Sequence, residues 1–196
     1  MSKRKIILAS KSERRKHLLK QIGINDFEIV ESNYEEDMCL SCDHRELAKI
    51  LSLNKGLDVA KKYDDAIVIS GDTFVVFDGK FIGKPKNKQD ARNTLKSYSG
   101  KDVLVISGFA VIDTKTNIII NDYSEVLVRF SAITDEEIDD YIETGEPMDK
   151  AGSFGMMHKG AVLIDSINGD YYSVVAFPIN KIYLALKELG VNVLKY

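Results

Sequence analysis

Two adjacent arginines, Arg14 and Arg15, stand at the predicted start of a helix, where cations are unfavourable. The helix dipole leaves partial positive charge at that end, so each arginine costs roughly 0.3–1 kcal/mol there. A bound anion reverses the sign, because free N–H groups, the hydroxyls of Ser10 and Ser12 and two guanidinium groups can all face it. The spacing therefore favours a phosphate site, with a solvated helix start as the alternative.

The stretch Ile6–Arg15, IILASKSERR, contains the elements that would position these groups. Its first three residues are typical of a short buried strand, and Ser10 with Glu13 has the S-x-x-E spacing of a capping box. The helix is predicted to run on to Ile22 and to end at Gly23.

Carboxylates at two places could hold a divalent cation. Asp72 lies between Gly71 and Thr73, where a buried strand is predicted to break, and a buried carboxylate needs a cation, a metal or a backbone donor. Residues 35–37 form an acidic loop. Magnesium often uses one or two carboxylates together with substrate phosphates, so one loop carboxylate is predicted to meet Asp72. The alternatives are an Asx turn at Asp72 and a solvated loop.

Three lysines add candidate cations. Lys84 precedes a proline, which favours an extended backbone and gives the ammonium a defined direction. Lys55 lies on a helix predicted over residues 43–62, and Lys150 lies in the glycine-punctuated segment Gly145–Gly160. Loops of that length without secondary structure are often functional. Ordinary solvent exposure is the alternative for each lysine.

The composition is that of one globular domain of 196 residues, or of one domain with two lobes. A formal net charge of −3 argues against general nucleic-acid binding, which usually leaves a basic face. No apolar run approaches the ~20 residues of a membrane span. We therefore expect no nucleic-acid or membrane partner and a cytoplasmic location.

Cys39 and Cys42 have the C-x-x-C spacing. A thioredoxin-like redox pair would lie at a helix N-terminus, and Asp43 is predicted to cap a helix directly afterwards. A zinc site would need two further ligands, and the sequence has no second cysteine pair. Incidental thiols are favoured, and a thiol redox protein is kept as a rival hypothesis.

The order of the other predicted elements mixes helix crossovers with hairpins. Hairpin turns are expected at residues 78–79, 113–117 and 168–169, strands at 161–164 and 171–176, and helices at 87–98, 134–145 and 179–189. A mixed sheet with helices packed on its faces, an α/β fold, is predicted.

Five segments carry the chemistry-bearing residues in a fixed order. They are LASKSERR at Leu8–Arg15, SGDTFV at Ser70–Val75, IGKP at Ile82–Pro85, GEPMDKAGSFG at Gly145–Gly155 and GDYYSVVAFP at Gly169–Pro178. Together they resemble the motifs of the Maf (septum formation) family of nucleoside triphosphate pyrophosphatases, and the resemblance covers nearly the whole chain.

This resemblance implies a hydrolase acting on acid anhydrides, which cleaves a nucleoside triphosphate to the monophosphate and pyrophosphate with a divalent metal, Mg or Mn. It implies a single Maf-like domain over residues 1–196, with a strongly twisted mixed sheet, flanking helices and two lobes around a deep central cleft, similar to inosine triphosphate pyrophosphatases. It also implies a house-cleaning role against non-standard nucleotides and a link to cell-division arrest. Family members often form homodimers, and the sequence leaves that partner open.

The resemblance also assigns roles to single residues. Asp72 is the implied proton acceptor that activates water, and Glu36 is the second acidic group, acting through the metal that both would bind. The residues implied to line the triphosphate are Ser10, Arg14, Arg15, Lys55 and Lys84.

Three positions bear on the preferred nucleotide. Arg14 and Thr73 match the subgroup that acts on dTTP and UTP, whereas the 7-methyl-GTP subgroup carries Trp and Gln there. Met157 stands where the first subgroup usually has Gln and the second has Glu, and a thioether cannot read a pyrimidine edge as an amide can. The hypothesis is a dTTP/UTP pyrophosphatase with relaxed discrimination. A 7-methyl-GTP-type or broad-specificity enzyme and a non-catalytic nucleotide-binding regulator are the alternatives.

Overall fold

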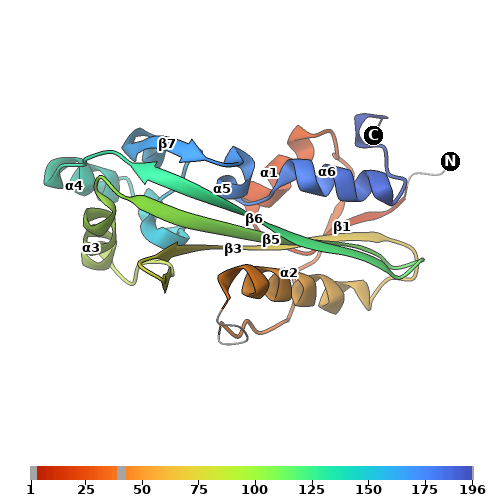
Figure 1. Ribbon diagram of the computed structural model, residues 1–196. Helices are drawn as coiled ribbons and strands as arrows, with labels where there is room; N and C mark the ends of the chain where they lie inside the picture. Colours follow the sequence, from red (N-terminus) through yellow and green to blue (C-terminus); the bar gives the residue numbers. More distant parts are fainter. Residues whose placement is uncertain (1–3, 39–42, 196) are drawn as a thin grey trace. The chain divides into compact units, whose positions relative to one another are not determined.

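A computed structural model describes residues 4–38 and 43–195 of the chain (Figure 1). In this part of the chain a seven-stranded sheet has the order β2-β1-β3-β5-β6-β7, with β4 paired to β3. The strands are β1 (Ile6–Leu8), β2 (Glu28–Ile29), β3 (Ile67–Phe77), β4 (Lys80–Ile82), β5 (Asp102–Asp113), β6 (Ile118–Phe130) and β7 (Ile164–Asn168). Strand β1 pairs in parallel with β2 and β3, whereas β3–β4 and β6–β7 are antiparallel. The predicted mixed α/β fold is confirmed.

Helices flank this sheet. They are α1 (Glu13–Gln21), α2 (His44–Ala60), α3 (Lys88–Tyr98), α4 (Asp135–Glu143), α5 (Tyr171–Val175) and α6 (Ile179–Glu188). Shorter 3-10 turns cover Glu146–Asp149, Ala151–Ser153, Lys159–Leu163 and Val193–Lys195. Across the described ranges, no helix is both long and apolar enough to cross a membrane.

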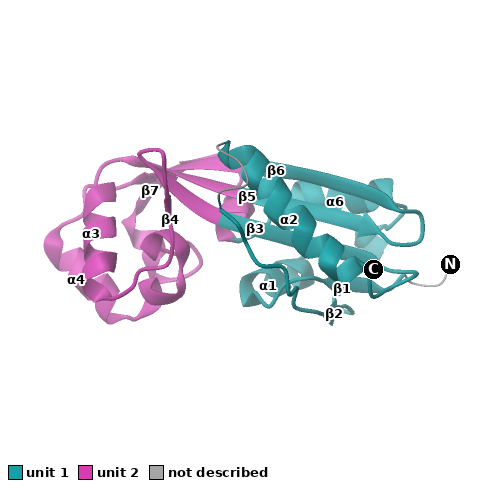
Figure 2. Cartoon of the chain, turned by 90° about the horizontal axis from the view of Figure 1, so that it is seen from below, with its two compact units in different colours: residues 1–73, 107–124, 176–196 teal, residues 74–106, 125–175 magenta. Residues whose placement is uncertain are grey.

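The chain divides into two compact units (Figure 2). The first unit comprises residues 1–73, 107–124 and 176–196, and the second comprises residues 74–106 and 125–175. Helices α1, α2 and α6 belong to the first unit, and α3, α4 and α5 belong to the second. The expected single domain with two lobes around a cleft stays a prediction.

In the first unit, helix α2 lies close to β3 and β5 because glycine stands at both contact points. A Cβ added at Gly56 of α2 would come within 2.6 Å of Ser70 Oγ on β3. One added at Gly108 of β5 would collide with the backbone carbonyl of Ala48. The Ser70 hydroxyl also donates to a carbonyl of α2 at 2.7 Å. This packing fixes α2, and with it Lys55, against the strands.

In the second unit, an aromatic cluster holds the glycine-rich segment in place. The Phe154 ring packs on Phe130 with centroids 5.0 Å apart, and Tyr98 packs on Phe130 at 5.1 Å. The backbone N–H of Gly152 donates to the Gly83 carbonyl at 3.0 Å. The predicted long loop is therefore wrong in part, because this segment folds into 3-10 turns anchored on a core.

Two predicted strands near the C-terminus are also wrong. The segment predicted as a strand over residues 171–176 forms helix α5, because Asp170 caps it: Asp170 Oδ2 accepts from the Ser173 N–H at 2.9 Å and from its hydroxyl at 2.6 Å. The strand predicted over residues 161–164 is displaced to β7, and a 3-10 turn takes its place. Local capping prevails over the strand preference of aromatic and β-branched residues.

The cap predicted at Asp43 is confirmed, since its Oδ1 accepts from the Arg45 N–H at 2.8 Å and α2 begins at the next residue. The C-x-x-C pair formed by Cys39 and Cys42 lies outside the described residues.

Candidate active site

The start of helix α1 is built by two serines. Ser12 is the N-cap, and its hydroxyl accepts from the Arg15 N–H at 3.4 Å. The Ser10 hydroxyl accepts from the Ser12 N–H at 3.2 Å. The predicted capping box of Ser10 with Glu13 is therefore wrong, because Glu13 is already the first helical residue. Its negative charge is favourable in the first turn of the helix.

Arg15 is a buried cation that joins three segments of the first unit. Only 9% of the residue is exposed. Its Nε donates to the Ala176 carbonyl at 3.2 Å, Nη1 to Ser10 Oγ at 3.1 Å and Nη2 to Thr73 Oγ1 at 3.2 Å. The guanidinium also lies over the Phe177 ring, 5.2 Å from its centroid. These contacts satisfy much of its hydrogen-bonding capacity without a carboxylate.

Charges around Arg15 act on it in opposite directions. Burial is the largest effect and lowers the pKa of Arg15, and the neighbouring charge of Arg14 lowers it further. The carboxylates of Asp72 and Glu36 raise it. Arg14 itself is partly exposed on α1. The start of α1 therefore presents two positive charges within electrostatic range of two carboxylates.

Thr73 takes part in the same network. Its hydroxyl lies 2.8 Å from Ser107 Oγ and donates to the Ala176 carbonyl at 3.1 Å, in addition to accepting from Arg15. The sequence analysis did not identify Ser107 as part of the site. The available signal was its place as a hydroxyl residue within the otherwise apolar run of β5.

Asp72 lies inside a continuous strand, not at a break. Strand β3 runs through it, so the predicted interruption at Gly71 and Asp72 is wrong. Gly71 is required for a different reason: a Cβ there would collide with the Phe177 ring and lie 2.9 Å from the Gly108 carbonyl. The strand is packed tightly at this point, and Asp72 is only 8% exposed.

Lys55 on α2 brings the two candidate carboxylates together. Its Nζ lies 2.5 Å from Asp72 Oδ1 and 2.6 Å from Glu36 Oε1. The side chains of Lys55 and Asp72 are 14% and 12% exposed, whereas that of Glu36 is 47% exposed. Asp72 and Glu36 therefore converge on one ammonium group at a partly solvent-accessible position.

The chemistry of these donors fits a divalent cation. Within residues 4–38 and 43–195, no three or more His, Cys, Asp or Glu side chains are grouped so that the protein alone could hold a metal ion. Two carboxylates, Asp72 and Glu36, do converge on the Lys55 ammonium. Magnesium bound to phosphates often takes only one or two carboxylates from the protein. A metal that arrives with a phosphorylated substrate is compatible with this pair.

The site residues predicted from the sequence fall into separate groups. Ser10, Arg15 and Thr73 form one network, and Glu36, Lys55 and Asp72 form another, all within the first unit. Lys84 and Met157 belong to the second unit, where Lys84 is exposed and Met157 is partly buried. Their predicted parts in substrate binding and specificity stay predictions.

Lys150, the third candidate cation, is engaged within the second unit. Its Nζ donates to Asp149 Oδ1 at 2.6 Å and to the Glu146 carbonyl at 3.2 Å. The Glu146 carboxylate accepts from the N–H groups of Lys159 and Gly160 at 2.9 and 3.3 Å. These bonds stabilise the fold of the glycine-rich segment. Lys150 and Glu146 therefore have a structural role.

Comparison with known proteins places the chain in a family. The family profile described as "Maf-like protein" matches residues 5–189. The chain is 48% identical over 190 residues to a protein of Clostridium novyi (strain NT) named dTTP/UTP pyrophosphatase, covering 96% of this chain and 99% of that protein. Proteins of the same name from Clostridium tetani and Methanococcoides burtonii are 46% and 40% identical, over 95% and 97% of this chain and 98% and 97% of theirs. The chain belongs to the Maf family.

Proposed function

We propose that this chain is a metal-dependent pyrophosphatase that hydrolyses dTTP and UTP to the monophosphate and pyrophosphate. The observation that carries the proposal is the convergence of Asp72 and Glu36 on Lys55. Relatives named dTTP/UTP pyrophosphatase, at 40–48% identity over nearly the full length, support the substrate class.

The start of α1 supplies the charge that a triphosphate requires. Arg14 is partly exposed and can contact phosphate oxygens directly, together with the Ser10 hydroxyl and N–H groups at the helix start, where the first turn leaves donors without intrahelical partners. Arg15 is buried beneath them and adds positive potential while it holds Ser10 in place. The family motifs also assign Lys84 to the triphosphate, and that part stays a prediction.

The reaction joins the oxygen of a water molecule to the α-phosphorus and breaks the bond from that phosphorus to the oxygen bridging to the β-phosphate. Asp72 takes the proton of the attacking water, and pyrophosphate leaves. The Lys55 ammonium, which both carboxylates contact, holds their charges together and orients Asp72. Bound by Asp72 and Glu36, Mg²⁺ or Mn²⁺ would neutralise charge on the phosphate oxygens.

Pyrophosphate release from a panel of triphosphates tests the proposal. With Mg²⁺ or Mn²⁺ present, dTTP and UTP should be hydrolysed faster than the other triphosphates of the panel, but only by a small factor. Met157→Gln supplies an amide that can pair with a pyrimidine edge, and a hydrogen-bonding reader of this kind is worth about 1–3 kcal/mol of discrimination. The variant should therefore prefer dTTP and UTP more strongly than the wild type. Strong turnover of 7-methyl-GTP with none of dTTP or UTP would contradict the assignment.

A non-catalytic nucleotide-binding regulator is the competing function. It would bind the same triphosphates through the α1 start and release no pyrophosphate. The presence of both Asp72 and Glu36 at Lys55 favours the enzyme. A homodimer, a cytoplasmic location and a link to cell-division arrest stay predictions.

A further inference from the structure

The loop that carries Glu36 is held against helix α2 by a carboxylate outside the proposed site. Asp58 Oδ2 accepts from the Asn33 N–H at 2.8 Å and from the Ser32 hydroxyl at 3.2 Å. The Ser32 hydroxyl oxygen in turn accepts from the Tyr34 N–H at 3.0 Å. Asp58 Oδ2 thus holds Ser32 and Asn33 directly, through charge-assisted bonds that are stronger than neutral ones, and it holds Tyr34 indirectly through Ser32.

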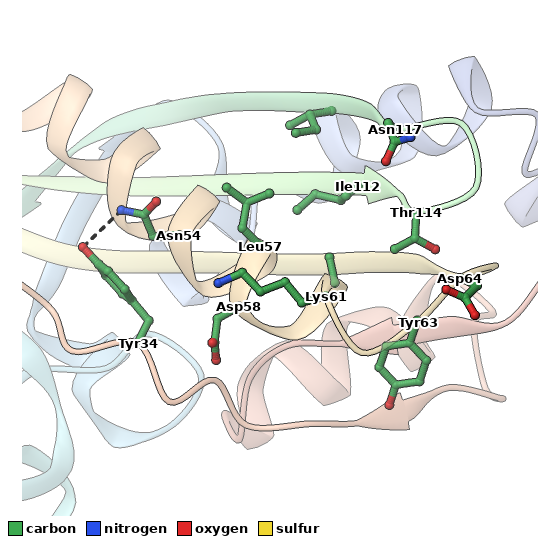
Figure 3. A pocket seen from close by; sticks show the side chains of 12 residues that line it. Tyr34, Asn54, Leu57, Asp58, Lys61, Tyr63, Asp64, Ile112, Thr114 and Asn117 are labelled. Atoms are coloured by element: carbon green, nitrogen blue, oxygen red, sulfur yellow. Dashed lines mark hydrogen bonds between the residues drawn. The ribbon is translucent and has the colours of Figure 1, made fainter.

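A second contact holds the same loop one turn earlier along the helix. The amide of Asn54 donates to the Tyr34 hydroxyl at 3.1 Å. Figure 3 shows Tyr34, Asn54 and Asp58 lining one pocket, with the Tyr34 ring extended toward α2. The loop is therefore attached to α2 both through its backbone, at Asp58, and through the side chain of Tyr34.

The two attachment points and Lys55 share one rigid element. Asn54, Lys55 and Asp58 all lie on α2, which glycine contacts hold close to β3 and β5. Glu36 follows Tyr34 by two residues in the loop. A loop residue this close to two fixed points has few positions open to it, so the attachment to α2 limits where the Glu36 carboxylate can lie relative to Lys55.

We propose that Asp58 is a positioning residue for the pyrophosphatase reaction: by holding Asn33 and Ser32, it places Glu36 against Lys55 and Asp72. This inference rests on the proposed function, because it assumes that Glu36 takes part in catalysis. Asp58 itself touches neither substrate nor reacting atoms in this account. Its effect on catalysis runs through Glu36 alone.

Three variants separate this role from general stabilisation. Asp58→Ala removes the acceptor for both loop donors. Asp58→Asn keeps a carbonyl oxygen that can accept from the same donors and should restore most of what Asp58→Ala loses. Glu46→Ala is the matched control, because it removes a carboxylate of the same helix that is exposed and paired with Lys49 at 3.0 Å.

Hydrogen exchange tests the anchor without reference to activity. In Asp58→Ala, the amides of Asn33 and Tyr34 should exchange faster than in the wild type, while exchange within β3 and β5 should stay unchanged. Glu46→Ala should leave the loop amides as they are. Unchanged exchange at Asn33 in Asp58→Ala would overturn the proposed anchor, and this result would be obtained whether or not the chain hydrolyses a nucleotide.

A double-mutant cycle with Glu36→Gln tests the route of the effect. Misplacing a catalytic group by about 1 Å can cost ~100-fold, so Asp58→Ala should lower kcat/KM for dTTP by about 10- to 100-fold. In the Glu36→Gln background the same substitution should cost less than about twofold, because residues that act through one another are not additive. An equal loss in both backgrounds would show that Asp58 does not act through Glu36, and would overturn the proposal while leaving the proposed function intact.

Discussion

Lys55 Nζ lies 2.5 Å from Asp72 Oδ1, and the same nitrogen lies 2.6 Å from Glu36 Oε1. Lys55 and Asp72 are largely withdrawn from solvent, with side-chain exposures of 14% and 12%. Removing one member of such a buried pair leaves the other charge uncompensated. The lysine is therefore central to the electrostatic balance of the proposed site.

Lys55→Met should abolish most activity. The substitution keeps an unbranched side chain of similar length but removes the ammonium, so the carboxylates of Asp72 and Glu36 lose the group that orients them. Loss of an oriented charge at a reacting centre typically costs about 100- to 1,000-fold in rate, and kcat for dTTP should fall by that amount.

Lys96→Met is the control for this prediction, since Lys96 also forms a lysine–carboxylate pair, with Asp135 at 2.8 Å, but on the exposed surface of α3. The kcat of Lys96→Met should stay within about twofold of the wild type, because exposed ion pairs contribute little to the stability of the fold. If Lys55→Met and Lys96→Met had equal rates, the part given to Lys55 would be wrong.

Substitution of Arg15 should lower mainly the stability of the fold, whereas substitution of Arg14 should weaken mainly substrate binding. Arg15→Met removes hydrogen bonds to Ser10, Thr73 and the Ala176 carbonyl, and should lower the free energy of unfolding by about 2–4 kcal/mol. Arg14→Met should change stability by less than about 1 kcal/mol, since Arg14 is partly exposed, and should raise KM for dTTP. Denaturant unfolding and steady-state kinetics check both. Equal destabilisation by the two substitutions would contradict the assignment of Arg15 as a buried link.

The stability of the fold should fall in acid through one ion pair, in which a buried Asp113 contacts a partly exposed Arg4. The hydrogen bonds from Arg4 lower the pKa of Asp113 to about 2, below its ordinary value. A depressed carboxyl pKa contributes stability above the unfolded-state pKa and loses it as the pH falls through the folded-state value. The contribution, about 1–2 kcal/mol, should be present above pH ~4 and disappear between pH ~4 and ~2.

Chemical denaturation of wild type and Asp113→Asn across this range measures the effect. The gap in unfolding free energy between the two proteins should narrow steadily as the pH is lowered from 5 toward 2 (about 1–2 kcal/mol in all). If the difference in unfolding free energy between the two proteins stayed constant over that range, the Arg4–Asp113 pair would not be a source of the loss of stability in acid.

Features that depend on neighbours in the sequence were predictable. The helix expected from residue 134 begins there, because a capping box joins Thr134 and Glu137: the Glu137 N–H donates to Thr134 Oγ1 at 3.2 Å and the Thr134 N–H donates to the Glu137 carboxylate at 2.7 Å. The turn at Asp78 and Gly79 joins β3 to β4 as expected, with both residues at positive φ. These signals are local, and no distant contact is needed to decide them.

Features that depend on distant contacts were not predictable. Gly71 resembles a turn glycine in the sequence, but it is required because the Phe177 ring packs on it. Arg15 resembles a surface arginine in the sequence, but it is buried and donates to the Ala176 carbonyl, 161 residues further along the chain. The resemblance to the family implied that Asp72, Glu36 and Lys55 belong to one site, whereas the sequence had no signal that Asp58 holds the acidic loop.

The most direct test of the central claim is pyrophosphate release by Asp72→Asn. The amide is nearly isosteric with the carboxylate but cannot accept the proton of the attacking water. We expect the variant to bind dTTP about as well as the wild type and to lose at least ~100-fold in kcat, in the range that removal of a general base gives. Asp72→Asn with a wild-type rate of pyrophosphate release would contradict the role of Asp72 and the account built on it.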